Sequence, residues 1–175
     1  MTLTSRPTVD GDLPFLLDLY AANRSDEFSL LGWTPEALRS FLEQQYRARQ
    51  VAWGLTAPAA DDRVLVRDGC PVGRLVLDRR AEGVRVVDIA VVPEEQGRGI
   101  GTTVLRRVLD EAEDARLPVT LHVVAASRAR RLYERLGFRT LREDGVHVLM
   151  GRTAGQAPET SRRAEGAAVQ PNTAT

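Results

Sequence analysis

The chain has 175 residues, of which 43% are hydrophobic and 27% charged, which suits one domain whose core needs no disulfides. All 24 basic residues are arginines and 24 residues are acidic, so the formal net charge of zero favours neither nucleic acid nor a membrane as partner. The lack of lysine excludes an internal Schiff base, and the single cysteine, Cys70, excludes an intrachain disulfide and a cysteine-rich zinc site. We therefore expect no metal and a cytoplasmic setting, since residues 1–12 lack a signal-peptide pattern and no apolar stretch would span a membrane.

The first sixty residues predict a short strand and two helices. The strand covers residues 3–6, and Asp12 is then placed to cap a helix that runs to about Asn23. The apolar spacing of this helix predicts a buried stripe, made of Leu13, Leu16, Leu17 and Tyr20. Thr34 as N-cap and Pro35 at the first helical position start a second helix, which continues toward Tyr46.

The middle of the chain predicts strands. Residues 63–67 and 72–78 form a hairpin around the turn Asp68-Gly69. Residues 84–92 follow as a nearly continuous β-branched run, which is typical of a central strand covered on both faces.

A strand–helix unit is expected after this central strand. Residues 99–115 predict an amphipathic helix and residues 119–124 an apolar strand. Ser127 is placed to cap a further helix, which ends at Gly137 as a left-handed C-terminal residue. A last hairpin is expected around Asp144-Gly145.

The order of elements predicts a single α/β domain of mixed α+β type over residues 1–152. From Gly151 onward no hydrophobic periodicity remains, and we expect residues 153–175 to be a disordered tail.

The segment with the clearest chemical content is a glycine-rich loop between the central strand and a helix. Gly97, Gly99 and Gly101 let backbone N–H groups converge, and the start of the helix adds unpaired N–H groups and positive partial charge. Arg98 adds a formal charge and Thr102 a hydroxyl, so the loop predicts a phosphate or pyrophosphate site. The alternative is a tight connection without a ligand. The spacing fits neither a Rossmann fingerprint nor a P-loop.

Two motifs in this region resemble those of the GNAT N-acetyltransferase family. The first is Gln96-x-x-Gly99-x-Gly101 after a strand that ends in Ile89-Ala90-Val91-Val92-Pro93. The second is Leu121-His122-Val123 followed by Ala129-x-x-Leu132-Tyr133-x-x-x-Gly137-Phe138. The resemblance covers roughly residues 6–152 and is most specific between Val87 and Phe138.

The resemblance implies a mostly antiparallel central sheet of six to seven strands with about four helices, splayed between its two central strands. It also implies direct transfer of an acetyl group from acetyl-CoA to a primary amine of a small molecule or peptide, without a metal. Acetyl-CoA would be held by backbone and side-chain groups of the two motifs, namely Ile89, Ala90, Val91, Gln96, Gly97, Arg98, Gly99, Ile100, Gly101, Thr102, Ser127 and Tyr133. The N–H near Val91 would polarise the thioester carbonyl.

Three residues are candidates for proton transfer. The resemblance makes Tyr133 the acid that protonates the leaving thiolate, although its spacing with Leu132 and Leu136 also fits a core position. His122 is a candidate base or a plain strand histidine. Asp88 would bind or deprotonate the amine, or pair with an arginine such as Arg85.

The acceptor site implied by the resemblance lies between the first helices and the last hairpin. Glu27, Trp33, Asp88 and His147 are its candidate residues. Ser127 serves either as a hydrogen-bond partner of CoA or only as a helix cap. The alternative function is a non-catalytic acyl-CoA sensor or partner module. Homodimers are common in the family, and no feature of the sequence decides the oligomeric state.

Overall fold

The protein is described here by a computed structural model that covers residues 2–28 and 32–155. Its elements follow one another as β1 (Leu3–Pro7), η1 (Asp10–Asp12), α1 (Leu13–Ala22), α2 (Ser25–Phe28), α3 (Pro35–Thr56), β2 (Asp61–Arg67), β3 (Cys70–Arg80), β4 (Gly83–Val91), η3 (Pro93–Glu95), α4 (Ile100–Asp114), β5 (Val119–Val124), α5 (Ala129–Arg135), β6 (Arg139–Glu143) and β7 (His147–Arg152).

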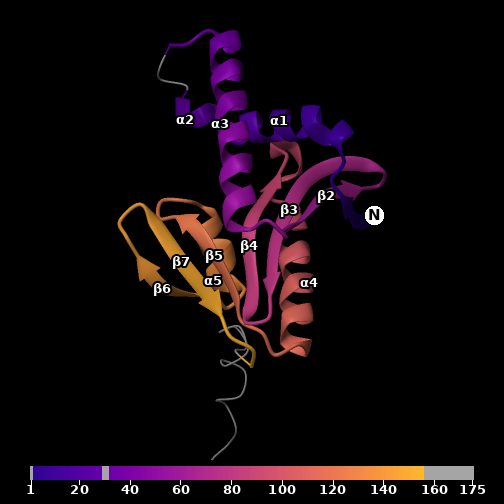
Figure 1. The fold of residues 1–175 in the computed structure, drawn as a ribbon, viewed down its shortest axis with the longest axis vertical. Coiled ribbons are helices and arrows are strands. Elements are labelled where there is room, and N and C mark those ends of the chain that lie inside the picture. The colour runs from indigo at the N-terminus through magenta and orange to yellow at the C-terminus, as the bar shows by residue number, and fades with distance from the viewer. Residues whose placement is uncertain (1, 29–31, 156–175) are drawn as a thin grey trace, which may run out of the picture.

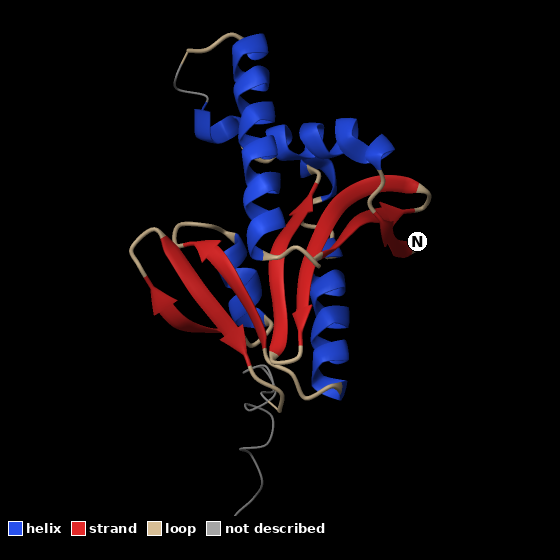
Figure 2. Cartoon of the chain, in the orientation of Figure 1, coloured by secondary structure: helices blue, strands red, loops and turns tan. Residues whose placement is uncertain are grey.

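The seven strands form one sheet in the order β1-β2-β3-β4-β5-β7-β6 (Figure 2). Every neighbouring pair is antiparallel except β4 and β5, which are parallel. The predicted fold class, a mixed and mostly antiparallel sheet with helices, is therefore confirmed.

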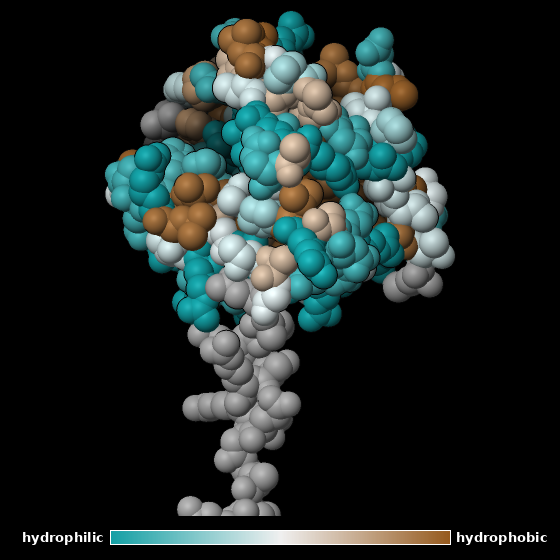
Figure 3. Space-filling model, turned by 60° about the horizontal axis from the view of Figure 1, so that its bottom comes forward, coloured by the Kyte–Doolittle hydropathy of each residue, from teal (hydrophilic) through white to brown (hydrophobic). Residues whose placement is uncertain are grey.

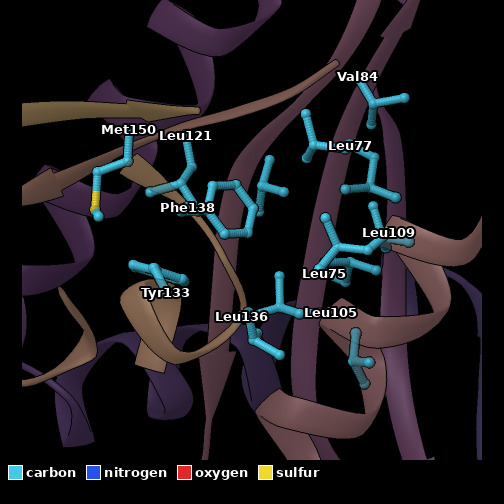
Figure 4. Packing of buried hydrophobic residues seen from close by; sticks show 14 of the residues in the cluster. Leu75, Leu77, Val84, Leu105, Leu109, Leu121, Tyr133, Leu136, Phe138 and Met150 are labelled. Carbon is cyan, nitrogen blue, oxygen red and sulfur yellow. The ribbon is translucent and has the colours of Figure 1, made fainter. Parts of the chain in front are cut away.

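Two hydrophobic clusters cover the two faces of the sheet. On one face, α4 and α5 bury Leu105, Leu109 and Leu136 against strand residues such as Leu75 and Leu121 (Figure 4). On the other face, α1 and α3 form a smaller cluster that packs on the end of β4, through Leu16, Leu19, Tyr20, Leu42 and Tyr46. Figure 1 shows α3 crossing the front of the sheet and α4 lying along its other side. Because successive side chains of a strand point to opposite faces, the sheet packs against a layer of helices on each side.

The first helix differs in detail from the prediction. Leu13 is 43% exposed and Leu19 is buried in its place. Asp12 does not cap α1 through its side chain, because its carboxylate accepts hydrogen bonds from Arg6 and from the N–H of Val9. The same contacts lower the pKa of Asp12 to about 2, with the Arg6 hydrogen bond as the largest cause. Asp12 therefore ties η1 to β1.

The other predicted elements are present, with small changes of boundary except at the end of α3. Thr34 caps α3 by accepting a hydrogen bond from the N–H of Ala37 at 3.3 Å, and the helix runs to Thr56, well beyond Tyr46. Gly137 has the predicted positive φ of 88° after α5. Hydrophilic side chains dominate the surface in Figure 3, with hydrophobic ones scattered among them.

The predicted tail lies largely outside the described residues, since only 153–155 of it are described. At its start the N–H of Gly155 donates to Glu113 at 2.6 Å. No helix of the described residues is long and apolar enough to cross a membrane.

Candidate active site

The candidate site is a cleft that opens where β4 and β5 separate. The two strands pair only at three positions, from Val84 opposite Val119 to Val86 opposite Leu121. Beyond them the strands diverge toward their C-terminal ends (Figure 1). A cavity of about 770 Å³ occupies this opening, within the size range of ligand sites. The predicted splay between the central strands is therefore confirmed.

The edge of β4 that faces the cleft carries free backbone N–H groups. Val92 donates its N–H to Val72 on β3 at 2.9 Å. Because successive residues of an antiparallel strand point their backbone groups to opposite edges, the N–H groups of Ile89 and Val91 point into the opening. An extended amide-containing ligand could pair with them as a further strand would.

The glycine-rich loop forms the opposite end of the cavity. Gly97 and Gly99 have φ angles of 74° and 82°, in the left-handed region that glycine adopts readily. Gly99 is the N-cap of the 15-residue helix α4 and offers no side-chain cap. The N–H groups of Ile100, Gly101 and Thr102 in the first turn therefore keep no helical partner. Combined with the positive end of the helix dipole, they fit an anionic diphosphate.

The space in front of this loop is open. A Cβ atom added at Gly97 or Gly99 would meet nothing within 4 Å. The chain thus fits the CoA diphosphate at this position through main-chain groups.

A side-chain network that the sequence analysis missed fixes the end of β4. Gln96 donates its side-chain amide to the carbonyl of Val91 at 3.0 Å and to Asn23 Oδ1 at 2.8 Å. Asn23 in turn donates to the same Val91 carbonyl at 3.2 Å. The Gln96 amide is thus occupied within the protein, and it joins the end of α1 to the loop that precedes α4.

Tyr133 lies on α5 and is only 7% exposed. Its ring packs edge to face on Phe138 with 5.9 Å between centroids, at one side of the core cluster (Figure 4). Burial, with a smaller effect of the Asp88 charge, raises the pKa of Tyr133 to about 12. The phenol therefore keeps its proton at neutral pH, as a general acid requires. The core and functional interpretations are compatible, because the buried residue also lines the cavity.

Asp88 faces the cavity and is paired with an arginine from another part of the fold. Arg49 on α3 donates to Asp88 Oδ2 at 2.7 Å. Burial raises the pKa of Asp88, and the charges of Arg49 and Arg74 oppose this rise. The suggested partner Arg85 is not used, because it lies 3.6 Å from Asp78 instead.

The face of α3 that carries Arg49 is a second feature of the site, and neither Arg49 nor Arg74 was predicted from the sequence. The Arg49 guanidinium lies over the rings of Trp53 at 4.2 Å and Tyr20 at 5.0 Å. The guanidinium of Arg74, from β3, lies over Tyr46 at 5.6 Å. On α3, Leu42 is followed at helical spacing by Tyr46, Arg49 and Trp53. This spacing was the one indication in the sequence that the three side chains share a face of the helix.

Most of the predicted site residues lie around the one cavity. Those that line it are Glu27, Asp88, Ile89, Ala90, Val91, Gln96, Gly97, Gly99, Ile100, Gly101, Thr102, Ser127 and Tyr133. Ser127 also accepts a hydrogen bond from the N–H of Ala129 at 3.2 Å. It is not the predicted N-cap of α5, because Arg128 occupies that position and makes no side-chain cap.

Four predicted residues do not line this cavity. His122 is exposed on β5, because its neighbour Leu121 takes the core face of the strand. His147 is exposed at the start of β7. Trp33 packs against Phe41 with 5.1 Å between ring centroids, and Arg98 is 3.3 Å from Glu95.

Potential metal ligands are not gathered in the part of the chain that the structure describes. No group of three or more His, Cys, Asp or Glu side chains there is placed to hold a metal ion.

The chain belongs to the GNAT family of acetyltransferases. The family model described as "Acetyltransferase (GNAT) family" matches residues 18–138, which is more than half of the chain. The resemblance noted in the sequence is thereby confirmed, and the chain is classed with the N-acetyltransferases.

Solved structures of other proteins share the fold. The PaiA N-acetyltransferase of Thermoplasma acidophilum, in complex with coenzyme A, superposes with a TM-score of 0.66 at 17% identity, covering 87% of this chain and 99% of that one. The ribosomal-protein-S18-alanine N-acetyltransferase of Escherichia coli has a TM-score of 0.60 at 20% identity, covering 90% and 97%. A GNAT acetyltransferase of Elizabethkingia anophelis with acetyl-CoA bound has a TM-score of 0.56 at 19% identity, covering 86% and 97%.

Proposed function

We propose that this protein transfers the acetyl group of acetyl-CoA directly to a primary amine while both substrates are bound. The observation that carries the proposal is a single cavity that joins the unpaired N–H groups at the start of α4 to Tyr133 and Asp88. The donor and the acceptor can therefore meet inside one cleft, without a covalent enzyme intermediate. The exposed Cys70 lies outside this cavity.

The donor would enter from the side of the glycine-rich loop. The N–H groups of the first turn of α4 would bind the diphosphate, and the free edge of β4 would hold the pantetheine arm in a strand-like manner. The N–H of Val91 would donate to the thioester carbonyl as negative charge develops on its oxygen.

Proton transfers would be divided between Asp88 and Tyr133. Asp88, directly or through a water molecule, would take a proton from the acceptor ammonium and so free the nitrogen lone pair. The amine nitrogen then bonds to the carbonyl carbon, the carbon–sulfur bond breaks, and Tyr133 gives its proton to the sulfur. The second proton lost by the nitrogen restores the phenol of Tyr133. Free CoA thiol and an N-acetylated product leave, with one proton released to solvent.

The test is to mix the protein with acetyl-CoA and a panel of amines and to follow free thiol. Tyr133→Phe is expected to lower kcat by about 10²- to 10⁴-fold, the usual contribution of a general acid. His122→Asn, on the exposed face of β5, is expected to keep the rate of the unmodified protein. Undiminished turnover of Tyr133→Phe would remove its acid role, and binding without turnover would favour the sensor alternative. Failure to bind acetyl-CoA in calorimetry would overturn the proposed function itself.

A further inference from the structure

The acceptor end of the cavity carries charges of both signs in direct contact. Asp88 and Arg49 both line it, and their carboxylate and guanidinium are 2.7 Å apart. Arg49 is held between Tyr20 and Trp53, whose ring centroids lie 5.0 and 4.2 Å from its guanidinium carbon. Its position is therefore fixed by stacking as well as by the ion pair.

Two arginines at this end of the cavity, Arg49 and Arg74, each have a donor atom without an acceptor in the described residues. The Nε atom of Arg49 and the Nη1 atom of Arg74 are both buried, and neither donates to any group of residues 2–28 and 32–155. Arg74 is only 3% exposed and spends its other donors on Asp62 and Gln50. Buried donors of a charged group without a partner are costly, so both call for an anionic or polar oxygen. Both arginines line the cavity, whereas Arg85, whose Nε is also buried without a partner, does not.

The charge balance of this end argues against a cationic substrate. Arg24 lies 3.9 Å from Glu27, Arg49 pairs with Asp88, and Arg74 pairs with Asp62. Each acid facing the acceptor is thus matched by an arginine. A polycationic acceptor would meet as much repulsion as attraction, whereas a neutral zwitterion matches adjacent opposite charges.

We propose that the acceptor is a free amino acid, whose ammonium group lies at Asp88 and whose carboxylate accepts hydrogen bonds from Arg49 and Arg74. This inference rests on the proposed function and adds the substrate class. The contact between Asp88 and Arg49 requires the two charged groups of the substrate to be close together, as they are in an α- or β-amino acid. Apolar and aromatic residues beside them, Leu16, Leu19 and Tyr20, leave a surface for an uncharged side chain.

The experiment compares matched acceptors that differ only in the carboxylate. The panel holds the protein amino acids and β-alanine, each with its carboxamide and its decarboxylated amine, and short peptides with free N-termini. Acetyl transfer is measured as kcat/KM for each member. The expected result is a preference of roughly 10- to 100-fold for an amino acid over its own amide and amine, the scale of hydrogen bonds between charged partners.

Arg49→Gln is expected to reduce this preference by about tenfold or more, because the carboxylate loses its charged donor. The preference is a ratio measured on one preparation, so a partly unfolded variant does not alter it. Arg47→Gln is the matched control, since it removes the same charge from an exposed position of the same helix outside the cavity. It is expected to keep the preference of the unmodified protein.

The outcomes separate this inference from the proposed function. Equal or better transfer to amides, amines or peptides would overturn the amino acid as acceptor and leave acetyl transfer in place. An unchanged preference in Arg49→Gln would overturn the role of Arg49, and with it the argument from the unpaired donors. Acetyl-CoA binding without acetylation of any panel member would also overturn the inference. Loss of acetyl-CoA binding itself would count against the proposed function.

Discussion

Replacing Gly99 by alanine tests whether the glycine-rich loop binds a diphosphate through its main chain. Gly99 has a φ of 82°, and a Cβ at this position would point into space with no atom within 4 Å. Gly145, in the hairpin between β6 and β7, has a φ of 88° and the same empty surroundings. The two substitutions therefore cause the same backbone strain, and only one of them stands in the candidate site.

Both variants are expected to lose about 1–2 kcal/mol of unfolding free energy, the cost of a left-handed conformation for a residue with a Cβ. For a chain of this size the melting temperature should fall by about 2–8 °C in both. Gly99→Ala should also bind CoA at least ~10-fold more weakly, since its methyl group displaces one or more charge-assisted hydrogen bonds of the diphosphate. Gly145→Ala should bind CoA as the unmodified protein does.

The assay is calorimetric titration with CoA, combined with thermal unfolding in the absence of ligand. Equal CoA dissociation constants for Gly99→Ala and Gly145→Ala, together with similar losses of melting temperature, would refute the placement of the diphosphate at this loop.

Three further predictions use other parts of the site. Because the pKa of Tyr133 rises from 10.0 to about 12, its contribution to stability is complete below pH 10 and lost as the pH approaches 12. Between about pH 9 and pH 12, the free energy of unfolding in urea should therefore fall by about 2–3 kcal/mol less in Tyr133→Phe than in the unmodified protein. The pKa of Asp88 is raised from 3.8, so kcat/KM should fall with decreasing pH at a midpoint above this value. In Asp88→Asn this fall should change. The same midpoint in both proteins would exclude Asp88 as the base. Gly73→Ala places a Cβ against the carbonyl oxygen of Ala90 and should cost about 1–3 kcal/mol, whereas Gly54→Ala, in open space on α3, should add about 0.5–1 kcal/mol. Equal stabilities of these two alanine variants in urea would contradict the close approach of β3 and β4.

Local chemistry allowed most of the fold to be predicted from the sequence. The Asp68-Gly69 turn, the Thr34 cap and Gly137 each determine a boundary through the residues next to it, and the structure has all three. The geometry of the glycine-rich loop was equally predictable, because it is determined within six residues.

The side-chain pairings around the cavity could not be predicted in this way. Arg49 meets Asp88 across 39 positions of sequence, and Gln96 meets Asn23 across 73. Such pairs depend on how α1 and α3 cross the sheet, which no short pattern specifies. The same reason explains why Leu13 was misplaced and Leu19 missed, since the face that α1 buries is set by its contact with α3.

The separation of β4 from β5 opens a cavity whose two ends differ in composition. The end at the start of α4 is formed mainly by peptide groups and glycines, which most side-chain substitutions leave untouched. The end around Asp88 is formed by side chains from α1, α3 and β3, whose identity can vary while the sheet stays the same. Under the proposed function, exchanging residues on the inner face of α3 should change which amines are acetylated while the binding of acetyl-CoA is retained. That helix is therefore the natural starting point for engineering specificity.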